Sequence, residues 1–150
     1  MLPYLNIAPT QGASPVAAEE VDARAELLRA AYAWRRATLV GDFDAQSSFY
    51  PEMMDAFYLW RDVPKAAVIA EKRRVFERAK KIAIDIEVPQ VLIDPGASSA
   101  RMYFRKTYDI NGNVNRSGEV LQELRWVKQA DGWKIVSERD IRVVHQARRD

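Results

Sequence analysis

The side chains that could do chemistry in this sequence are carboxylates, lysines and tyrosine hydroxyls. The chain of 150 residues has no cysteine and one histidine, His145. This excludes disulfides, thiol catalysis and cysteine-ligated metals, and it argues against a site with several histidine ligands. We therefore expect no metal and no cofactor, and we assign no catalytic residue from the sequence.

Glu138 lies near the end of the chain, in the segment QADGWKIVSERD. In this segment Asp-Gly indicates a hairpin turn, and the alternation of Trp133 and Ile135 indicates a strand packed on the core. Glu138 has the opposite parity, so we expect it to point away from the core. Its expected role is pairing across the sheet with Arg125 or Lys106.

Acid–base catalysis would need a carboxylate and a hydroxyl donor close together, with the carboxylate pKa raised by burial. The possible donors and carboxylates are Tyr50, Tyr58, Tyr103, Tyr108, Asp42, Asp44 and Glu138. Their spacing in the sequence brings no donor and carboxylate together.

Two predicted strands carry the polar side chains that could line a pocket. On each strand one face is the more apolar, and we expect it to point inward. The inward sets are Met102, Phe104, Lys106 and Tyr108, and Val120, Gln122, Leu124 and Trp126. Lys106 could then anchor a ligand carboxylate or have a lowered pKa. Alternatively, its stem packs while its ammonium reaches the pocket mouth.

The order of elements predicts an α+β fold. A helix over residues 17–39 has one face formed by Leu27, Ala31, Trp34 and Thr38. Asp42 is suited to cap a short helix ending near residue 49, and Asp62 to cap a third helix over residues 62–80. Residues 53–60 indicate a strand or extended segment. Strands over residues 82–93, 101–108, 119–128 and 133–144 follow, with a hairpin signal at Asn111. We expect a curved antiparallel sheet of four to five strands, with three N-terminal helices packed on one face.

The third helix is strongly basic. Residues 65–81 hold seven Lys or Arg and two Glu, whereas the whole chain has a net charge of only +2. The helix could bind an acidic polymer or partner. The sequence has no aromatic stacking platform and no nucleic-acid motif, however, so we expect no nucleic-acid partner and interpret the basic residues as a solvated helix face.

The chain length suits one domain, which we place at residues 17–146. Residues 1–16 are expected to be an irregular segment or linker, and residues 147–150 a tail. No apolar run is long enough to span a membrane, and the start lacks a signal-peptide pattern. We therefore expect a cytoplasmic protein, or a periplasmic or envelope one if the chain is a piece of an exported protein.

Three segments resemble the nuclear transport factor 2-like superfamily, which includes ketosteroid isomerase, scytalone dehydratase and polyketide-cyclase-like proteins. They are AYAWRRATLVGDFDAQSSFY, ARMYFRKTYDI and LQELRWVKQADGWKIVSERD. The resemblance implies a cone-shaped fold with a pocket between the concave sheet and the helices. More narrowly, the chain looks like the C-terminal accessory domain of bacterial L,D-transpeptidase-type proteins, which implies a non-catalytic module.

The resemblance also places an aromatic cluster at the roof and mouth of the pocket, although these rings could instead form core packing between helices. The candidate pocket residues are Trp34, Tyr50, Tyr58, Trp60, Phe104, Lys106, Tyr108, Gln122 and Trp126. Such a lining suits a small apolar or anionic ligand.

Two functions remain open. The first is a non-catalytic binding or interaction module that forms a homodimer through the outer face of the sheet, which carries Tyr103, Leu121 and Val127. The second is a small-molecule isomerase, dehydratase or cyclase that uses the pocket. A closed, aliphatic-filled cone favours the module. A roomy cavity with a buried carboxylate within hydrogen-bond reach of a tyrosine or lysine favours the enzyme.

Overall fold

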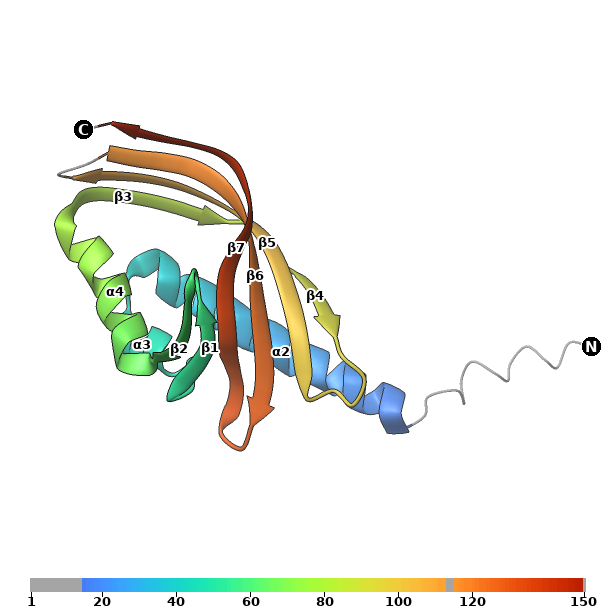
Figure 1. Ribbon diagram of the computed structural model, residues 1–150. Coiled ribbons are helices and arrows are strands. Elements are labelled where there is room, and N and C mark those ends of the chain that lie inside the picture. The colour runs from blue at the N-terminus through green and yellow to red at the C-terminus, as the bar shows by residue number, and fades with distance from the viewer. Residues whose placement is uncertain (1–14, 113–114, 150) are drawn as a thin grey trace, which may run out of the picture.

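The computed structural model describes residues 15–112 and 115–149, which form three helices and one seven-stranded sheet (Figure 1). The helices are α2 (Pro15–Val40), α3 (Phe43–Ser47) and α4 (Lys65–Arg78). The strands are β1 (Met53–Phe57), β2 (Trp60–Pro64), β3 (Ala79–Ile86), β4 (Gln90–Ile93), β5 (Ser99–Gly112), β6 (Asn115–Gln129) and β7 (Gly132–Arg149). The predicted α+β class is confirmed, with more strands than expected.

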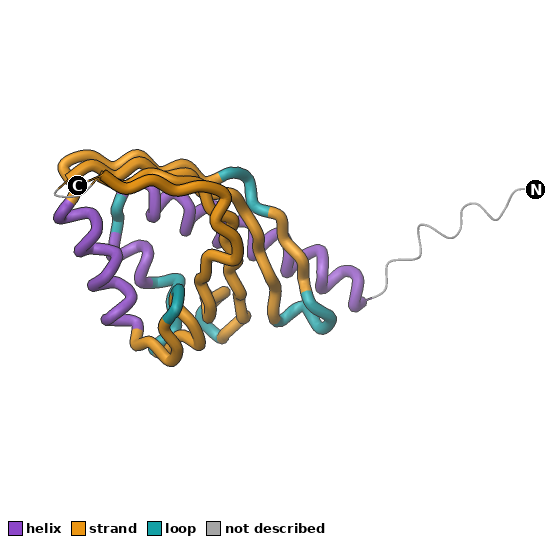
Figure 2. Tube along the Cα trace, turned by 45° about the horizontal axis from the view of Figure 1, so that its top comes forward, coloured by secondary structure: helices purple, strands orange, loops and turns teal. Residues whose placement is uncertain are grey.

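The sheet is mixed, curved and open. Its order is β2-β1-β7-β6-β5-β3, and β4 pairs with β5 beside β3. The pairing of β1 with β7 is parallel, and the other pairings are antiparallel. Strands β5, β6 and β7 bend sharply along their length, so that the helices lie within the concave side (Figures 1 and 2). This arrangement is the cone that the sequence predicts.

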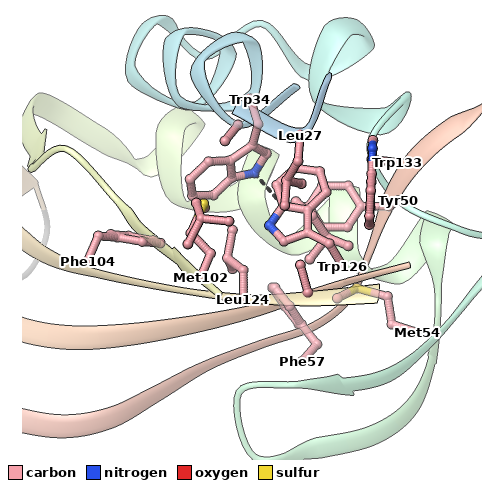
Figure 3. Packing of buried hydrophobic residues seen from close by; sticks show 14 of the residues in the cluster. Leu27, Trp34, Tyr50, Met54, Phe57, Met102, Phe104, Leu124, Trp126 and Trp133 are labelled. Atoms are coloured by element: carbon pink, nitrogen blue, oxygen red, sulfur yellow. Dashed lines mark hydrogen bonds between the residues drawn. The ribbon is translucent and has the colours of Figure 1, made fainter. Parts of the chain in front are cut away.

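The core lies between α2 and the concave face of the sheet. The predicted face of α2 is confirmed, since Leu27, Ala31, Trp34 and Thr38 are all buried. The Trp34 ring packs against Phe104, with 5.6 Å between ring centroids, and Figure 3 shows the surrounding cluster. The predicted parity of β5 and β6 is also confirmed, because Met102, Phe104, Val120, Gln122, Leu124 and Trp126 are buried.

The two predicted helix caps have different outcomes. Asp42 caps α3, and its side chain accepts a hydrogen bond from the Ala45 backbone N–H at 3.0 Å. The predicted Asp62 cap is wrong. Asp62 lies in β2 with a positive φ of 51°, and Pro64 occupies the N-cap position of α4.

Residues 53–60, predicted as a strand or extended segment, form β1, a tight turn and the first residue of β2. Tyr58 in the turn has a φ of 55°, in the left-handed region that ordinary residues enter only in turns. The turn directs the chain back along β1, and the Tyr58 backbone N–H donates to the Glu138 carbonyl at 2.7 Å. This hairpin adds the two strands that the sequence does not predict as a pair.

The parity prediction for β7 is wrong because the β6–β7 pairing contains bulges. Trp126 is opposite Ile135, but Leu124 is opposite Glu138, so β7 has one extra residue between these pairs. A bulge of this kind shifts every later side chain to the other face. Two more register shifts follow toward the end of β7. Glu138 therefore faces the same side as Leu124, which is the concave side.

Regular secondary structure extends beyond the predicted domain limits at both ends. Residues 1–14 of the expected irregular segment lie outside the described residues, as do residues 113–114, which include the last residue of the predicted Asn-Gly-Asn hairpin. Helix α2 already begins at Pro15. Residues 147–149, expected as a tail, belong to β7, which pairs with β6 as far as Arg149. No helix within residues 15–112 and 115–149 has the length and apolar character needed to cross a membrane.

The packing of α2 gives a direct stability prediction. Leu27 is fully buried at the centre of the helix face, so Leu27→Ala leaves a cavity in the core. We expect the free energy of unfolding to fall by about 2–5 kcal/mol, measured by urea denaturation. Val21 on the same helix is 67% exposed, and Val21→Ala should change stability by less than about 0.5 kcal/mol. Equal effects of the two substitutions would contradict the placement of α2.

Candidate functional site

Glu138 is the centre of a buried polar cluster. Its side chain is 1% exposed. Its Oε1 accepts a hydrogen bond from the Tyr50 hydroxyl at 2.6 Å, and its Oε2 accepts one from Lys72 Nζ at 2.8 Å. Trp34 Nε1 donates to the Tyr50 oxygen at 3.1 Å (Figure 3). The expectation that Glu138 points away from the core and pairs with Arg125 or Lys106 is therefore wrong.

The cluster has a defined charge state. Burial alone would raise the pKa of Glu138, but the charge and hydrogen bond of Lys72 and the hydrogen bond of Tyr50 hold this pKa below its ordinary value. Burial and the neighbouring carboxylate raise the pKa of Tyr50 well above its ordinary value. Glu138 is thus an ionised acceptor and Tyr50 a neutral donor. A general base needs a free oxygen and a raised pKa, so Glu138 positions Lys72 and Tyr50 instead.

A cavity of about 440 Å³ adjoins this cluster, which is large enough for a small organic molecule. Its apolar wall includes Phe57, Leu59, Trp60, Val75, Phe76 and Val120. Its polar wall includes Thr38, Gln46, Tyr58, Lys72, Lys106 and Asp140. The mixture of aromatic rings and a few charged groups is typical of a ligand site.

The predicted pocket residues divide into two groups. Tyr58, Trp60, Lys106 and Tyr108 line the cavity. Trp34, Tyr50, Phe104, Gln122 and Trp126 are buried behind its wall. In this second group Trp34, Tyr50, Phe104 and Trp126 belong to the hydrophobic core. The Tyr50 hydroxyl bonds to Glu138, and the Gln122 amide bonds to the lining residues Tyr58 and Asp140. Whether the four lining residues bind a ligand stays a prediction.

A second polar chain joins a tyrosine to a carboxylate at the cavity wall. Gln122 Nε2 donates to the Tyr58 hydroxyl oxygen at 3.1 Å and to Asp140 Oδ1 at 2.7 Å. Burial, followed by the charge of Glu138, raises the pKa of Tyr58, so its hydroxyl is neutral and can donate. The sequence spacing does not indicate this pairing, because the β7 bulge after Ile135 brings Asp140 opposite Gln122.

Lys106 lines the cavity and forms no ion pair with the described residues. Within residues 15–112 and 115–149 no carboxylate lies within 4.0 Å of its ammonium, although its charge contributes to the lowered pKa of Glu138. Lys72, in contrast, is engaged by Glu138 at 2.8 Å. Lys106 is therefore a lining cation that can pair with an anionic ligand without breaking an ion pair; Arg116 also lines the cavity.

Two polar atoms of the lining are buried without a protein partner. Thr38 Oγ1 and Gln46 Oε1 have no hydrogen-bond partner in the described part of the chain, and both residues line the cavity. Buried polar atoms are normally satisfied. A ligand or ordered water in the cavity can supply the missing hydrogen bonds.

Two charged residues of the candidate site, Lys72 and Asp140, are absent from the pocket residues that the sequence predicts. The sequence does indicate the orientation of Lys72, because Lys72 shares a helix face with Val68 and Val75 and this apolar face packs toward the sheet. Among the described residues no group of three or more His, Asp and Glu side chains could hold a metal ion.

The outer face of the sheet carries Tyr103, Leu121 and Val127, all partly exposed. The Tyr103 hydroxyl donates to Glu123 Oε2 at 2.9 Å, and Arg139 donates to the other oxygen of Glu123 at 2.9 Å. Self-association through this face stays a prediction.

No protein-family model matches the sequence, and no curated protein matches it. Several solved structures match the fold. A hexachlorocyclohexane dehydrochlorinase, LinA-type3, from Novosphingobium barchaimii is 8% identical with a TM-score of 0.71, over 87% of this chain and 92% of that one. A protein assigned as a scytalone dehydratase from Novosphingobium aromaticivorans is 7% identical with a TM-score of 0.71, over 87% and 89%.

A protein assigned as a dehydratase of the nuclear transport factor 2-like family from Streptomyces avermitilis is 16% identical with a TM-score of 0.65, over 84% of this chain and 99% of that one. At such identities the likeness concerns the fold. The chain has the nuclear transport factor 2-like fold, as the sequence resemblance implies. The narrower likeness to L,D-transpeptidase accessory domains stays a prediction.

The buried ion pair gives a prediction about stability. Glu138→Gln leaves the Lys72 ammonium without its counter-charge, and we expect a loss of about 3–5 kcal/mol in the free energy of unfolding. Lys72→Met should cost a similar amount. The double variant should lose clearly less than the sum, which urea denaturation measures. Glu77→Gln, on the exposed side of α4, is the matched control and should leave stability nearly unchanged. Losses in the double variant that equal the sum of the two single losses would contradict the pairing of Glu138 with Lys72.

The lowered pKa of Glu138 also predicts a pH dependence. A carboxylate whose folded pKa lies below its unfolded value of about 4.5 stabilises the fold fully above that pH. The contribution disappears as the pH falls through the folded pKa. As the pH is lowered from about 5, the free energy of unfolding should therefore fall more for wild type than for Glu138→Gln. Parallel pH profiles for the two proteins would show that the Glu138 pKa is not lowered.

Proposed function

We propose that this protein binds a small, largely apolar molecule that carries a carboxylate or another anionic oxygen in the cavity between α4 and the concave sheet. The observation that carries the proposal is the position of Lys106, a lining cation with no ion-pair partner within the described residues, in a cavity that aromatic rings also line. The apolar body would contact Phe57, Trp60 and Phe76, and the anionic oxygen would bind Lys106.

The buried cluster supports this function by fixing the polar wall. Glu138 holds the Lys72 ammonium in place and keeps it from turning toward a ligand or water. Tyr50 in turn fixes the Glu138 carboxylate. Lys72 therefore contributes positive potential without moving, and Lys106 remains the group that adjusts to the ligand.

The binding proposal is tested with 1-naphthoate, which combines a flat apolar body with a carboxylate. We expect Lys106→Met to weaken its binding by about tenfold or more, because a charge-assisted hydrogen bond is lost. Isothermal titration calorimetry measures the affinity. Lys81→Met, an exposed lysine of β3, is the matched control. Equal affinity of wild type and Lys106→Met, or equal affinity for neutral 1-naphthylmethanol, would contradict the proposal.

A chemical step in the cavity is the second candidate function. The buried Glu138 beside Tyr50 and Lys72 meets the condition set above for an enzyme, but both of its oxygens are already occupied, so the chemistry would fall to other side chains. Its supporting observation is that Tyr58 and Asp140 are bonded to the same nitrogen of Gln122. Tyr58 accepts this bond, which leaves its own O–H free to donate to an oxyanion. Asp140 could remove a proton next to a carbonyl while Tyr58 and Lys106 stabilise the enolate oxygen. This geometry suits an isomerase, a dehydratase or a related lyase, and two proteins of the same fold are assigned as dehydratases.

The catalytic candidate is tested with 2-tetralone, a flat ketone with exchangeable protons beside its carbonyl. We expect wild type to accelerate deuterium incorporation, measured by NMR in deuterated buffer. Asp140→Asn should slow the exchange by about 100-fold or more, in line with the usual contribution of a general base. Tyr58→Phe should also slow it, whereas Asp109→Asn on the exposed part of β5 should not. If wild type exchanges the 2-tetralone protons no faster than buffer alone, the catalytic proposal is wrong and the binding function alone stands.

A further inference from the structure

Thr38 on α2 and Gln46 on α3 contribute two unused oxygen atoms to the lining of the cavity. The Gln46 residue is 1% exposed and Thr38 is 7% exposed. Thr38 Oγ1 and Gln46 Oε1 are shielded from solvent, and neither has a hydrogen-bond partner among the residues that the structure describes. Such atoms are rare in folded proteins. The proposed contacts of the anion and the apolar body leave both of them unpaired.

A backbone carbonyl determines which atom of the Gln46 amide is left unpaired. Gln46 Nε2 donates to the Ala37 carbonyl oxygen at 3.4 Å, and the Asp42 backbone N–H donates to the same oxygen at 2.9 Å. A carbonyl oxygen can only accept, so the amide nitrogen faces it and Oε1 is the free atom. Because Ala37 directly precedes Thr38, the two unpaired oxygens belong to the same part of the lining.

Aromatic packing holds this part of the lining in place. Gly41, between α2 and α3, lies so close to Phe76 of α4 that an added Cβ would be 2.7 Å from the ring. Phe43, the first residue of α3, packs edge-on against the same ring, with 5.4 Å between ring centroids. Phe76 is itself part of the cavity wall. The ends of α2 and α3 are therefore fixed against α4, and Thr38 and Gln46 are presented to the cavity by a packed frame.

The two oxygens complement a single hydroxyl group. A threonine hydroxyl donates one hydrogen bond and also accepts, whereas an amide oxygen only accepts. A ligand O–H can donate to Gln46 Oε1 while its oxygen accepts from the Thr38 hydroxyl. An ether or carbonyl oxygen would leave Gln46 Oε1 unpaired, and a carboxylate would place negative charge beside it. Turning Thr38 about its χ1 bond toward a ligand breaks no hydrogen bond, because its hydroxyl makes none within the described residues.

We propose that Thr38 and Gln46 form a subsite for a hydroxyl group of the bound ligand. The subsite deepens the proposed function and rests on it for the position of the ligand, whose anionic oxygen binds Lys106. Lys106 belongs to β5, whereas the subsite belongs to α2 and α3. The two polar groups of the ligand therefore contact different walls of the cavity. The substrate class is an apolar hydroxy acid whose hydroxyl lies apart from its carboxylate.

The test compares three kinds of probe by isothermal titration calorimetry. They are 1-naphthoate, the hydroxy-1-naphthoates that carry the hydroxyl on the ring remote from the carboxylate, and the methyl ethers of these hydroxy acids. We expect at least one hydroxy isomer to bind wild type at least about tenfold more tightly than 1-naphthoate, because a site built to bond a hydroxyl discriminates against analogues that lack it. Its methyl ether should lose this gain, because it has no O–H to donate.

Two variants of similar side-chain size locate the gain. Thr38→Val and Gln46→Met should each reduce the preference for the hydroxy acid over 1-naphthoate by about threefold or more, since each removes one hydrogen bond. Both should leave the affinity for 1-naphthoate nearly unchanged. Thr38→Ser keeps the hydroxyl and should retain the preference. The matched controls are Thr107→Val and Gln129→Met, because both residues are exposed and neither lines the cavity.

The outcomes separate the subsite from the Lys106 anchor. The subsite is wrong if no hydroxy isomer gains affinity, or if the preference survives in Thr38→Val and Gln46→Met proteins with normal thermal unfolding. If Gln46→Met does not fold, the comparison of Thr38→Val with Thr38→Ser decides. If only the dependence on Lys106 is observed, the anchor stands and the subsite fails. If only the hydroxyl preference is observed, the subsite stands and the anchor fails. Failure of every probe to bind would overturn both.

Discussion

The buried ion pair between Glu138 and Lys72 is the interaction on which the site depends. It joins the sheet to α4, and Tyr50 ties the same carboxylate to the segment after α3. Moving two charges out of water is costly, and a buried pair of this kind stabilises only when further hydrogen bonds satisfy it. Here both carboxylate oxygens are occupied. The pair therefore fixes the distance between α4 and the sheet, and with it the width of the cavity.

The bulges in β7 make this pair possible. One extra residue after Ile135 brings Glu138 to the concave side, and the regular pairing that follows places Asp140 opposite Gln122. Bulges also increase local twist and bend a strand, which agrees with the sharp curvature of the long strands in Figure 1. The same local feature thus bends the sheet around the helices and places two carboxylates at the cavity.

Much of the fold is predictable from the sequence because the apolar patterns are regular. The α2 face at Leu27 and Trp34, the Asp42 cap and the inward sets of β5 and β6 follow from simple periodicity. The orientation of Glu138 does not, since a single extra residue reverses parity and no residue type in the segment marks the bulge. The link between Tyr58 and Asp140 through Gln122 cannot be predicted from the sequence for the same reason. Of the cavity residues, Lys106 is predictable because its strand has regular pairing with β6.

The fold itself accommodates many activities, so the chemistry rests on the side chains at the cavity. The measurement that tests the account most directly is a crystal structure of the protein with 1-naphthoate. We predict that the naphthyl ring contacts the aromatic wall, that the carboxylate lies within hydrogen-bond distance of Lys106 Nζ, and that Glu138 remains on Lys72 and Tyr50. A ligand bound outside the cavity, or a Glu138 side chain turned to the outer face of the sheet, would contradict the account.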